Sequence, residues 1–304
     1  MEKLLDVIII GAGPAGITAA IYAKRYGMNL EIFEKSIPGG NVVNAFEIEN
    51  YPGFAKIHGF ELALNMQNQL KALGVEIKFR NIISISKNED ETFNVKTSNG
   101  EVYHSRFVVL AVGSKPNTLD IYNEQKYLGR GISYCATCDG SFYKNKDVIV
   151  VGGGNSAITE ALYLANITNS VTIIARNELR ASKAELDKLL SKNNVIIKKH
   201  TSIMSLIENN NVLTGVKVRN SETDEVSEIK TDGIFVYIGS SAPTSFLKDL
   251  NILKENSYIK VDENFETDVK GLFSVGDSID KRLRQIVTAQ SDAANAIEVI
   301  KDRL

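Results

Sequence analysis

Residues 4–16 read Leu4-Leu5-Asp6-Val7-Ile8-Ile9-Ile10-Gly11-Ala12-Gly13-Pro14-Ala15-Gly16. The apolar run that ends at Ile10 is typical of a buried parallel strand, and a glycine-rich turn follows it directly. A helical pattern covers residues 17–26, and a second strand at residues 29–34 ends in an acidic side chain. Strand, glycine turn, helix and strand within about thirty residues form one βαβ unit. This stretch predicts an α/β fold.

The same arrangement returns later in the chain. An expected strand at residues 146–151 leads into Gly152-x-Gly154-x-x-Ala157, and a helix at 158–165 and a strand at 170–175 follow. The apolar strands 107–112 and 233–238 each run into a stretch of glycine, serine and proline, which is typical of a crossover between domains. We therefore expect two Rossmann-like dinucleotide-binding domains. Residues 1–115 and 244–304 form the first, and residues 116–243 form a second domain inserted into it.

Composition narrows the class of protein. The chain has 304 residues, 43% of them hydrophobic, and a formal net charge of −2, as in an ordinary globular protein of about two domains. This charge gives no bulk attraction to nucleic acid, so we predict no nucleic-acid partner. The apolar run near the N-terminus is too short to cross a bilayer, and we recognise no signal-type segment. We expect no membrane association and a cytoplasmic location.

The chain contains two cysteines, Cys135 and Cys138. A secreted disulfide scaffold uses several spread-out cysteines, and a structural zinc site needs about four ligands. The histidines His58, His104 and His200 are scattered, so we predict no metal site. The pair is either an intracellular redox centre or two incidental buried thiols.

Both glycine motifs have the context of a dinucleotide site. Gly11-x-Gly13-x-x-Gly16 follows a strand and opens a helix, and Glu34 lies about twenty residues downstream. The glycines allow the backbone to approach a pyrophosphate at the helix N-terminus, and Glu34 would accept hydrogen bonds from the adenosine ribose hydroxyls. Near the C-terminus, the short strand 271–275 ends in Gly276-Asp277, which resembles the second FAD motif of disulfide reductases with two dinucleotide domains.

Nearly the whole chain resembles low-molecular-weight thioredoxin reductases. The matching segments include Glu49-Asn50-Tyr51-Pro52-Gly53, Arg284-Gln285 and, most specifically, Cys135-Ala136-Thr137-Cys138-Asp139-Gly140. The resemblance implies a homodimer that uses FAD and reduces a thioredoxin-like protein. Together with the glycine motif, it implies an FAD site formed by Gly11, Gly13, Pro14, Ala15, Gly16, Glu34, Lys35, Gly40, Asn41, Asn50, Ile82, Ala111, Gly113, Gly276, Asp277, Arg284, Gln285 and Ile286.

The resemblance also assigns roles within the cysteine motif. A CxxC pair at a helix start has a lowered thiol pKa because the helix dipole favours negative charge. The family pattern implies that Cys138 receives electrons from the flavin, that Cys135 attacks the partner disulfide, and that Asp139 exchanges the proton. It further implies that the inserted domain rotates about its two crossovers. A helix-capping carboxylate remains the alternative role for Asp139.

The electron donor is inferred from the second glycine motif and the loop after the next strand. The second glycine motif, with Gly152 and Gly154, could bind a nicotinamide dinucleotide such as NADP(H). NADPH-dependent relatives resemble each other in a His-Arg-Arg-x-x-x-Arg string, whereas this chain reads Ala175-Arg176-Asn177-Glu178-Leu179-Arg180. Only Arg176 and Arg180 remain to contact a 2′-phosphate. The sequence therefore favours reduced ferredoxin, the donor used by one branch of the family, and an NADPH-dependent thioredoxin reductase is the alternative. Two basic pairs, Lys144/Lys146 and Lys281/Arg282, are candidates for docking an acidic ferredoxin.

Two other functions stay open. A dithiol oxidase would keep FAD and the CxxC pair, lack a nicotinamide site and pass electrons to oxygen. A non-enzymatic redox sensor would bind flavin and respond to the state of the cysteine pair through domain orientation. Asp139 beside the pair favours catalysis.

Overall fold

A computed structural model describes residues 4–45, 47–254 and 257–304. The chain divides into two compact units, Met1–Lys115 with Ser241–Leu304 and Pro116–Ser240. The sequence placed the second crossover between 243 and 244, three residues later. The segments at the two crossovers pair with each other as the short strands β7 (Lys115–Pro116) and β16 (Ser240–Ser241).

The first unit is built on a seven-stranded sheet with the order β3-β2-β1-β6-β5-β4. The strands β1, β2, β3 and β6 are parallel, and β4 and β5 form an antiparallel extension. The long strand β6 pairs with β5 through its first half and with β17 through its second half. The strands are β1 Leu5–Ile10, β2 Leu30–Glu34, β3 Ile77–Phe79, β4 Ile82–Lys87, β5 Phe93–Thr97, β6 Val102–Leu110 and β17 Leu272–Ser274.

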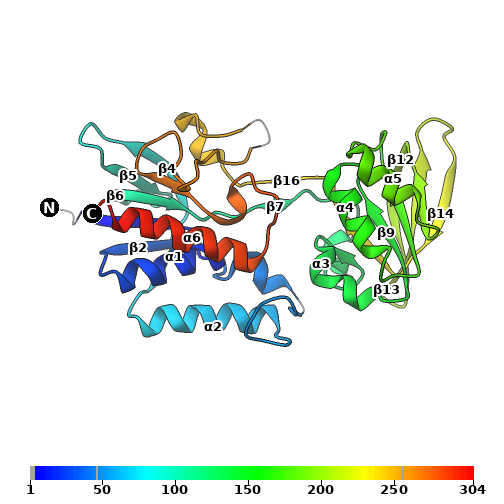
Figure 1. Ribbon diagram of the computed structural model, residues 1–304, viewed down its shortest axis with the longest axis horizontal. Coiled ribbons are helices and arrows are strands. Elements are labelled where there is room, and N and C mark those ends of the chain that lie inside the picture. Colours follow the sequence, from blue (N-terminus) through cyan, green and yellow to red (C-terminus); the bar gives the residue numbers. More distant parts are fainter. Residues whose placement is uncertain (1–3, 46, 255–256) are drawn as a thin grey trace. The chain divides into compact units, whose positions relative to one another are not determined.

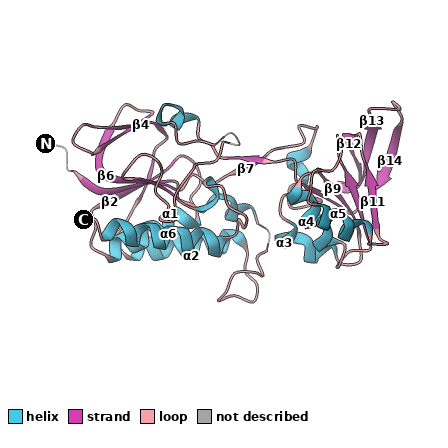
Figure 2. Cartoon of the chain, turned by 45° about the horizontal axis from the view of Figure 1, so that its top comes forward, coloured by secondary structure: helices cyan, strands magenta, loops and turns pink. Residues whose placement is uncertain are grey.

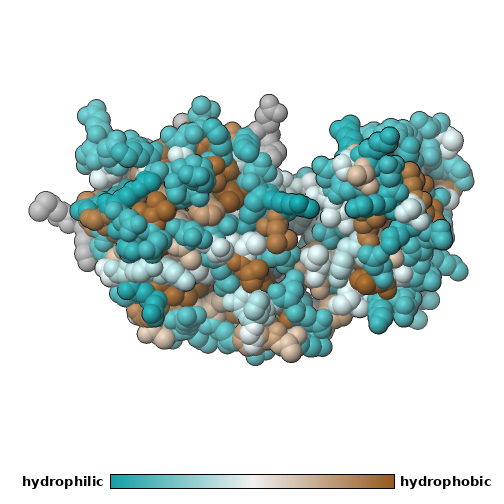
Figure 3. Space-filling view, in the orientation of Figure 1, coloured by the Kyte–Doolittle hydropathy of each residue, from teal (hydrophilic) through white to brown (hydrophobic). Residues whose placement is uncertain are grey.

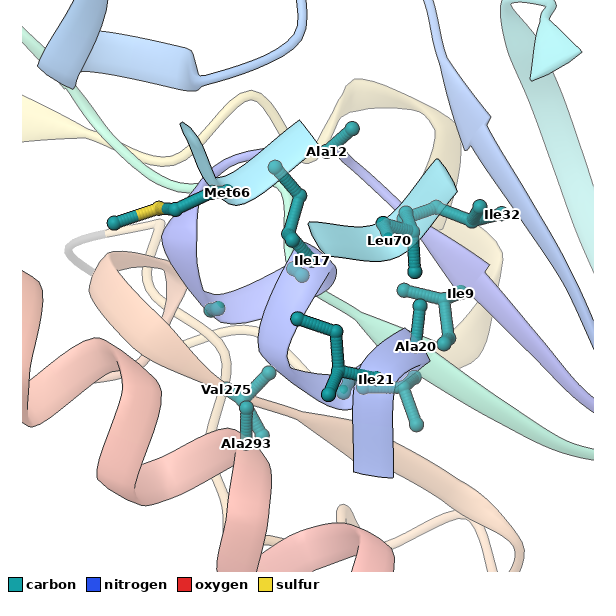
Figure 4. Close-up of a cluster of buried hydrophobic side chains, with 14 of the residues drawn as sticks. Ile9, Ala12, Ile17, Ala20, Ile21, Ile32, Met66, Leu70, Val275 and Ala293 are labelled. Atoms are coloured by element: carbon teal, nitrogen blue, oxygen red, sulfur yellow. The ribbon is translucent and has the colours of Figure 1, made fainter. Parts of the chain in front are cut away.

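Three helices cover one face of this sheet, where α1 and α6 lie side by side next to α2 (Figure 1). They are α1 Pro14–Arg25, α2 Gly59–Ala72 and α6 Ile286–Lys301, and the 3₁₀ turns η1 Gly40–Asn44, η4 Ser245–Leu250 and η5 Gly276–Ser278 complete the unit. Small side chains let α1 pack closely between sheet and helices: Ala20 and Ala293 lie in the same core as Ile9 and Leu70 (Figure 4). A second core fills the opposite face of the sheet.

The second unit has a five-stranded, fully parallel sheet with the order β11-β10-β9-β15-β8. Helices pack on one face, and the antiparallel strands β12-β13-β14 cover the other (Figure 2). The strands are β8 Ile132–Ser133, β9 Asp147–Val151, β10 Ser170–Ile174, β11 Val195–Lys198, β12 Thr201–Asn209, β13 Val212–Asn220, β14 Val226–Lys230 and β15 Gly233–Val236. The helices are α3 Ala136–Asp139, α4 Asn155–Leu164 and α5 Lys183–Leu190, with η2 Glu124–Tyr127 and η3 Gly140–Tyr143.

The predicted α/β architecture is confirmed in both units. The helices α1 and α4 begin three residues earlier than the sequence indicated, at Pro14 and Asn155. Proline is well suited to the first helical turn, where its missing N–H group has no intrahelical acceptor. On the face shown in Figure 3, hydrophilic residues predominate and hydrophobic ones form small separate groups. Within the described part of the chain, we find no helix with the length and apolar character that a membrane span requires.

Candidate active site and dinucleotide sites

The first glycine turn lies where β1 meets α1. A Cβ atom on Gly16 would lie 1.8 Å from the Gly11 carbonyl oxygen, and one on Gly11 would lie 2.3 Å from that of Ala111. Gly11 also has a φ of +102°, which side chains disfavour. Glu34, at the end of the neighbouring strand β2, accepts hydrogen bonds from the backbone N–H groups of Ala12 (2.8 Å) and Ser36 (2.9 Å). The turn and the acid therefore meet at the carboxyl edge of the sheet.

Other predicted flavin residues gather around this turn. A Cβ on Gly40 would lie 3.2 Å from the Cα of Gly13, so η1 reaches the glycine turn. Asn41 follows and donates a hydrogen bond from Nδ2 to the Ser114 carbonyl oxygen (2.9 Å). Pro14 and Ala15 form the first turn of α1, Ala111 and Gly113 follow β6, and Lys35 is exposed after β2. Ile82 instead packs at the start of β4 in the core on the opposite face of the sheet.

The second predicted flavin motif packs against the first. Gly276 has a φ of +73°, and a Cβ on it would lie 2.9 Å from the Cβ of Ala15 in α1. The next residue, Asp277, carries a buried oxygen, Oδ1, that has no hydrogen-bond partner in the protein. Burial raises the pKa of Asp277, and the nearby Lys281 and Arg284 oppose this effect. An orphaned carboxylate oxygen fits a ligand that brings hydroxyl donors.

The start of α6 completes this group. Gln285 caps the helix in a capping box with Thr288, and its Oε1 accepts a hydrogen bond from Nδ2 of Asn50 (3.1 Å). The guanidinium of Arg284 lies over the Tyr258 ring, with 4.4 Å between Cζ and the ring centroid. The Nε of Arg284 is buried and has no hydrogen-bond partner in the protein. Ile286 is the first helical residue. These residues, with the glycine turns, fit the FAD that the family implies.

One buried ion pair at this site was not foreseen. Lys281 Nζ lies 2.6 Å from Asp292 Oδ2, and their side chains are only 14% and 13% exposed. The same carboxylate oxygen accepts a hydrogen bond from the Gly276 backbone N–H (3.1 Å). The prediction that Lys281 belongs to an exposed docking surface is therefore wrong, because its charge is buried against Asp292. The other three candidates, Arg282, Lys144 and Lys146, are exposed.

The cysteines form a disulfide in the second unit. Cys135 and Cys138 are bonded, with their Cα atoms 5.3 Å apart, and Cys135 is the N-cap of the short helix α3. The chain reaches them from the edge strand β8, whose last residue is Ser133. Ser133 Oγ donates to Asp139 Oδ2 at 2.6 Å and accepts from the Cys135 backbone N–H at 3.0 Å. Serine thus joins the predicted acid to the backbone of the disulfide, a link that no sequence motif indicated.

Asp139 directly follows Cys138 in the chain, and its side chain is half-buried. Burial raises the pKa of Asp139, and the hydrogen bond from Ser133 partly opposes this rise. A carboxyl group with a raised pKa exchanges protons at a pH closer to neutrality, which suits general acid–base chemistry. Its backbone N–H donates to the Cys135 carbonyl oxygen (3.0 Å), so it ends α3 and does not cap its start.

The second glycine turn shares one edge of the sheet with the disulfide. The strands β8, β9 and β15 are parallel, so their carboxyl ends meet there. Tyr237, just after β15, accepts a hydrogen bond at its hydroxyl from the Ala136 backbone N–H (2.5 Å). A Cβ on Gly152 would lie 2.2 Å from the Tyr237 carbonyl oxygen, whereas one on Gly154 would meet nothing within 4 Å. Tyr237 therefore contacts both the glycine turn and the disulfide helix, a role the sequence did not indicate.

The two arginines predicted to contact a 2′-phosphate lie on the loop after β10. Arg176 and Arg180 are exposed on the loop after β10, and the Arg180 backbone N–H donates to the Gly153 carbonyl oxygen (2.6 Å). The acid of this loop, Glu178, turns to Lys199 and His200. A cavity of about 270 Å³ includes none of the predicted site residues; it is lined by Ile197, Lys198, Lys199, Thr201, Val218, Asn220, Glu225 and Ser227.

Comparison with known proteins agrees with this arrangement. Residues 5–293 match the family model described as pyridine nucleotide-disulphide oxidoreductase. The chain belongs to this family. As a family member it is an oxidoreductase that acts on disulfides, and the resemblance to low-molecular-weight thioredoxin reductases is confirmed. The thioredoxin reductase family is FAD-binding, which agrees with the predicted cofactor.

Individual relatives match this chain over nearly its whole length. It is 38% identical to a thioredoxin reductase of Bacillus subtilis (strain 168) over 301 residues, 99% of this chain and 95% of the relative. It is 42% identical to one of Mycoplasma genitalium over 303 residues, 99% of this chain and 96% of the relative. The crystal structure of thioredoxin reductase from Streptococcus pyogenes superimposes with a TM-score of 0.91 at 36% identity, covering 99% and 98% of the two chains.

Proposed function

We propose that this protein reduces the disulfide of a thioredoxin-type partner through FAD and the Cys135–Cys138 pair. The observation that carries the proposal is the disulfide at the carboxyl edge of the second sheet, followed in the chain by the half-buried Asp139, which Ser133 links to the Cys135 backbone. Relatives of 38% to 42% identity that are named thioredoxin reductase support the partner class. We propose FAD contacts in the first unit, a nicotinamide site in the second, and a homodimer.

The reaction follows from thiol–disulfide exchange. When bound, FAD would supply the two electrons that, with two protons, reduce the Cys135–Cys138 disulfide to a dithiol. The Cys135 thiolate then attacks one sulfur of the partner disulfide, and the other partner sulfur leaves as a thiol after it takes a proton. Cys138 attacks the mixed disulfide, which releases the reduced partner and restores the Cys135–Cys138 bond. Asp139 donates and recovers the proton, and the N-terminus of α3 favours the Cys135 thiolate.

A reduced nicotinamide dinucleotide is the donor we propose. The family description names a pyridine nucleotide, and the second glycine turn leaves room at Gly154 for a ligand. The ferredoxin donor expected from the sequence has no support in the comparisons, and burial removes Lys281 from its predicted docking surface. Ferredoxin stays the second candidate because the loop after β10 carries only two arginines.

The test mixes the FAD-loaded enzyme with oxidised thioredoxin and supplies NADPH, NADH or reduced ferredoxin in separate reactions. We expect a nicotinamide donor to bleach the flavin and to produce free thiols on thioredoxin. Replacing either cysteine with serine should abolish thiol production, and Asp139→Asn should lower kcat by about 100-fold.

Three other outcomes would contradict the proposal. Turnover with reduced ferredoxin and with neither nicotinamide would overturn the proposed donor. Oxidation of a small dithiol by oxygen without thioredoxin activity would identify a dithiol oxidase. Flavin binding without turnover would leave a redox sensor.

A further inference from the structure

The loop after β10 lies against the second glycine turn. Besides the hydrogen bond from the Arg180 N–H to the Gly153 carbonyl oxygen, a Cβ on Gly153 would lie 3.3 Å from the Cβ of Ala175 and 3.5 Å from the carbonyl oxygen of Glu178. In nucleotide-binding sheets of this type, side chains at this strand end contact the adenosine ribose. They decide between a 2′-hydroxyl and a 2′-phosphate.

Glu178, the acid in this loop, contacts two side chains of the turn that follows the neighbouring strand β11. Its Oε2 lies 2.6 Å from Lys199 Nζ, and its Oε1 lies 3.2 Å from His200 Nε2. These contacts hold the pKa of Glu178 below its usual range. The carboxylate therefore faces Lys199 and His200 and does not reach back toward the glycine turn.

The backbone places Lys199 and His200 beside the loop. They follow β11, which pairs with β10 in parallel register up to Ile174 and Lys198, so both strands end at the same edge. His200 has a φ of +50°, a left-handed conformation that histidine adopts more readily than most residues. The backbone N–H of Ser221 donates to its carbonyl oxygen (2.7 Å) and holds this turn. Glu222 lies on the far side of the imidazole, 3.5 Å from Nδ1.

We propose that Lys199, together with His200, selects a dinucleotide with a 2′-phosphate, and that Glu178 competes with this phosphate for the same two side chains. The inference rests on the proposed nicotinamide site and names the residues that discriminate between its ligands. Lys199 adds a positive charge beside a loop that carries Arg176 and Arg180 but has the neutral Asn177 between them.

The competition follows from exposure and charge. The side chains of Lys199 and Glu178 are 44% and 64% exposed, and an ion pair in contact with water is weak. A phosphate carries more charge than a carboxylate, and its oxygens accept several charge-assisted hydrogen bonds. It can therefore displace Glu178. A 2′-hydroxyl has no such charge, so Glu178 stays on Lys199 and contributes little to binding NAD(H).

The experiment measures binding of 2′,5′-ADP and of 5′-AMP to the FAD-loaded full chain by calorimetry. These probes differ only in the 2′-phosphate and need no electron transfer. We expect wild type to bind 2′,5′-ADP at least about 10-fold more tightly than 5′-AMP. Lys199→Met should remove about 10-fold of the affinity for 2′,5′-ADP alone, and Lys199→Arg should keep most of it.

Glu178→Gln gives the sharper outcome, because removing a competitor should strengthen binding of 2′,5′-ADP by several-fold and leave 5′-AMP unchanged. Lys192→Met is the control, since Lys192 is partly exposed and donates its side-chain hydrogen bond to the neutral Asn166 in the same unit. Equal binding of the two probes to wild type, or weaker 2′,5′-ADP binding in Glu178→Gln, would overturn the inference. Such a result would leave the proposed function standing, because thioredoxin reduction by a nicotinamide donor is measured in a separate assay.

Discussion

Ser133 Oγ donates a hydrogen bond to Asp139 Oδ2 across 2.6 Å, and the same hydroxyl accepts the Cys135 backbone N–H at 3.0 Å. One serine on an edge strand therefore contacts both the acid and the backbone at the start of the disulfide helix. A hydrogen bond to a carboxylate stabilises its ionised form, so it limits the rise in the Asp139 pKa that burial causes.

Ser133→Ala should raise the pKa of Asp139 further, because burial would act without an opposing hydrogen bond. Asp139 then stays protonated to a higher pH, and the limb of the pH–rate profile that reports its ionisation moves upward in pH. The measurement is kcat/KM for thioredoxin reduction as a function of pH. Ser141→Ala, at an exposed position five residues after α3 begins, serves as control. A profile that moves to lower pH would contradict this assignment.

The glycines of the first turn serve two different purposes, which alanine substitutions separate. In Gly16→Ala the new methyl group meets the Gly11 carbonyl oxygen at 1.8 Å, so the free energy of unfolding of the apoprotein should fall by about 1–3 kcal/mol. In Gly13→Ala the nearest atom lies at 3.8 Å, so the fold tolerates it and only the approaching pyrophosphate is obstructed. Urea unfolding of the apoproteins and FAD titration distinguish the two. Normal FAD affinity in Gly13→Ala would count against this site.

Asp277 is disfavoured as a buried carboxylate when no ligand donates to its Oδ1. Its pKa is raised in the folded apoprotein, so its contribution to stability is present at low pH and is lost as the pH rises through the folded-state pKa. Asp277→Asn removes this loss. The apoprotein variant should become more stable than wild type as the pH rises, while its affinity for FAD falls by about 10-fold. Asp280→Asn, at an exposed neighbour, is the control, and thermal unfolding from pH 4 upward reads out the difference.

The Lys281–Asp292 pair should matter far more to stability than an exposed pair nearby. Lys281→Met leaves a buried carboxylate without its cation and should lower the free energy of unfolding by about 3–5 kcal/mol. Lys254 pairs with Asp280 at 2.8 Å, but both side chains are 43% exposed, so Lys254→Met should cost no more than about 1 kcal/mol. Denaturant unfolding of the FAD-loaded proteins compares them. Equal losses would show that burial of the Lys281 pair has no energetic consequence.

The sequence by itself determined the features that depend on neighbouring residues. The apolar run before Gly11, the spacing of the glycines and the acid at Glu34 are enough to predict a βαβ unit, because strand, turn and helix form within one short segment. The same holds for the repeat at Gly152 and for the CxxC pair, whose spacing lets the two sulfurs bond.

Only the tertiary structure decided which distant side chains meet. Tyr237 bonds Ala136 across 101 residues, Lys199 reaches Glu178 across 21, and Lys281 is buried against Asp292. No periodicity encodes these pairs. They arise because parallel strands bring their carboxyl ends to one edge, and because α6 packs its buried face against the Gly276 turn. Lys281, which the sequence presents as a surface charge, is thus paired with Asp292 in the interior, and Lys199 and His200 become candidates for binding a phosphate.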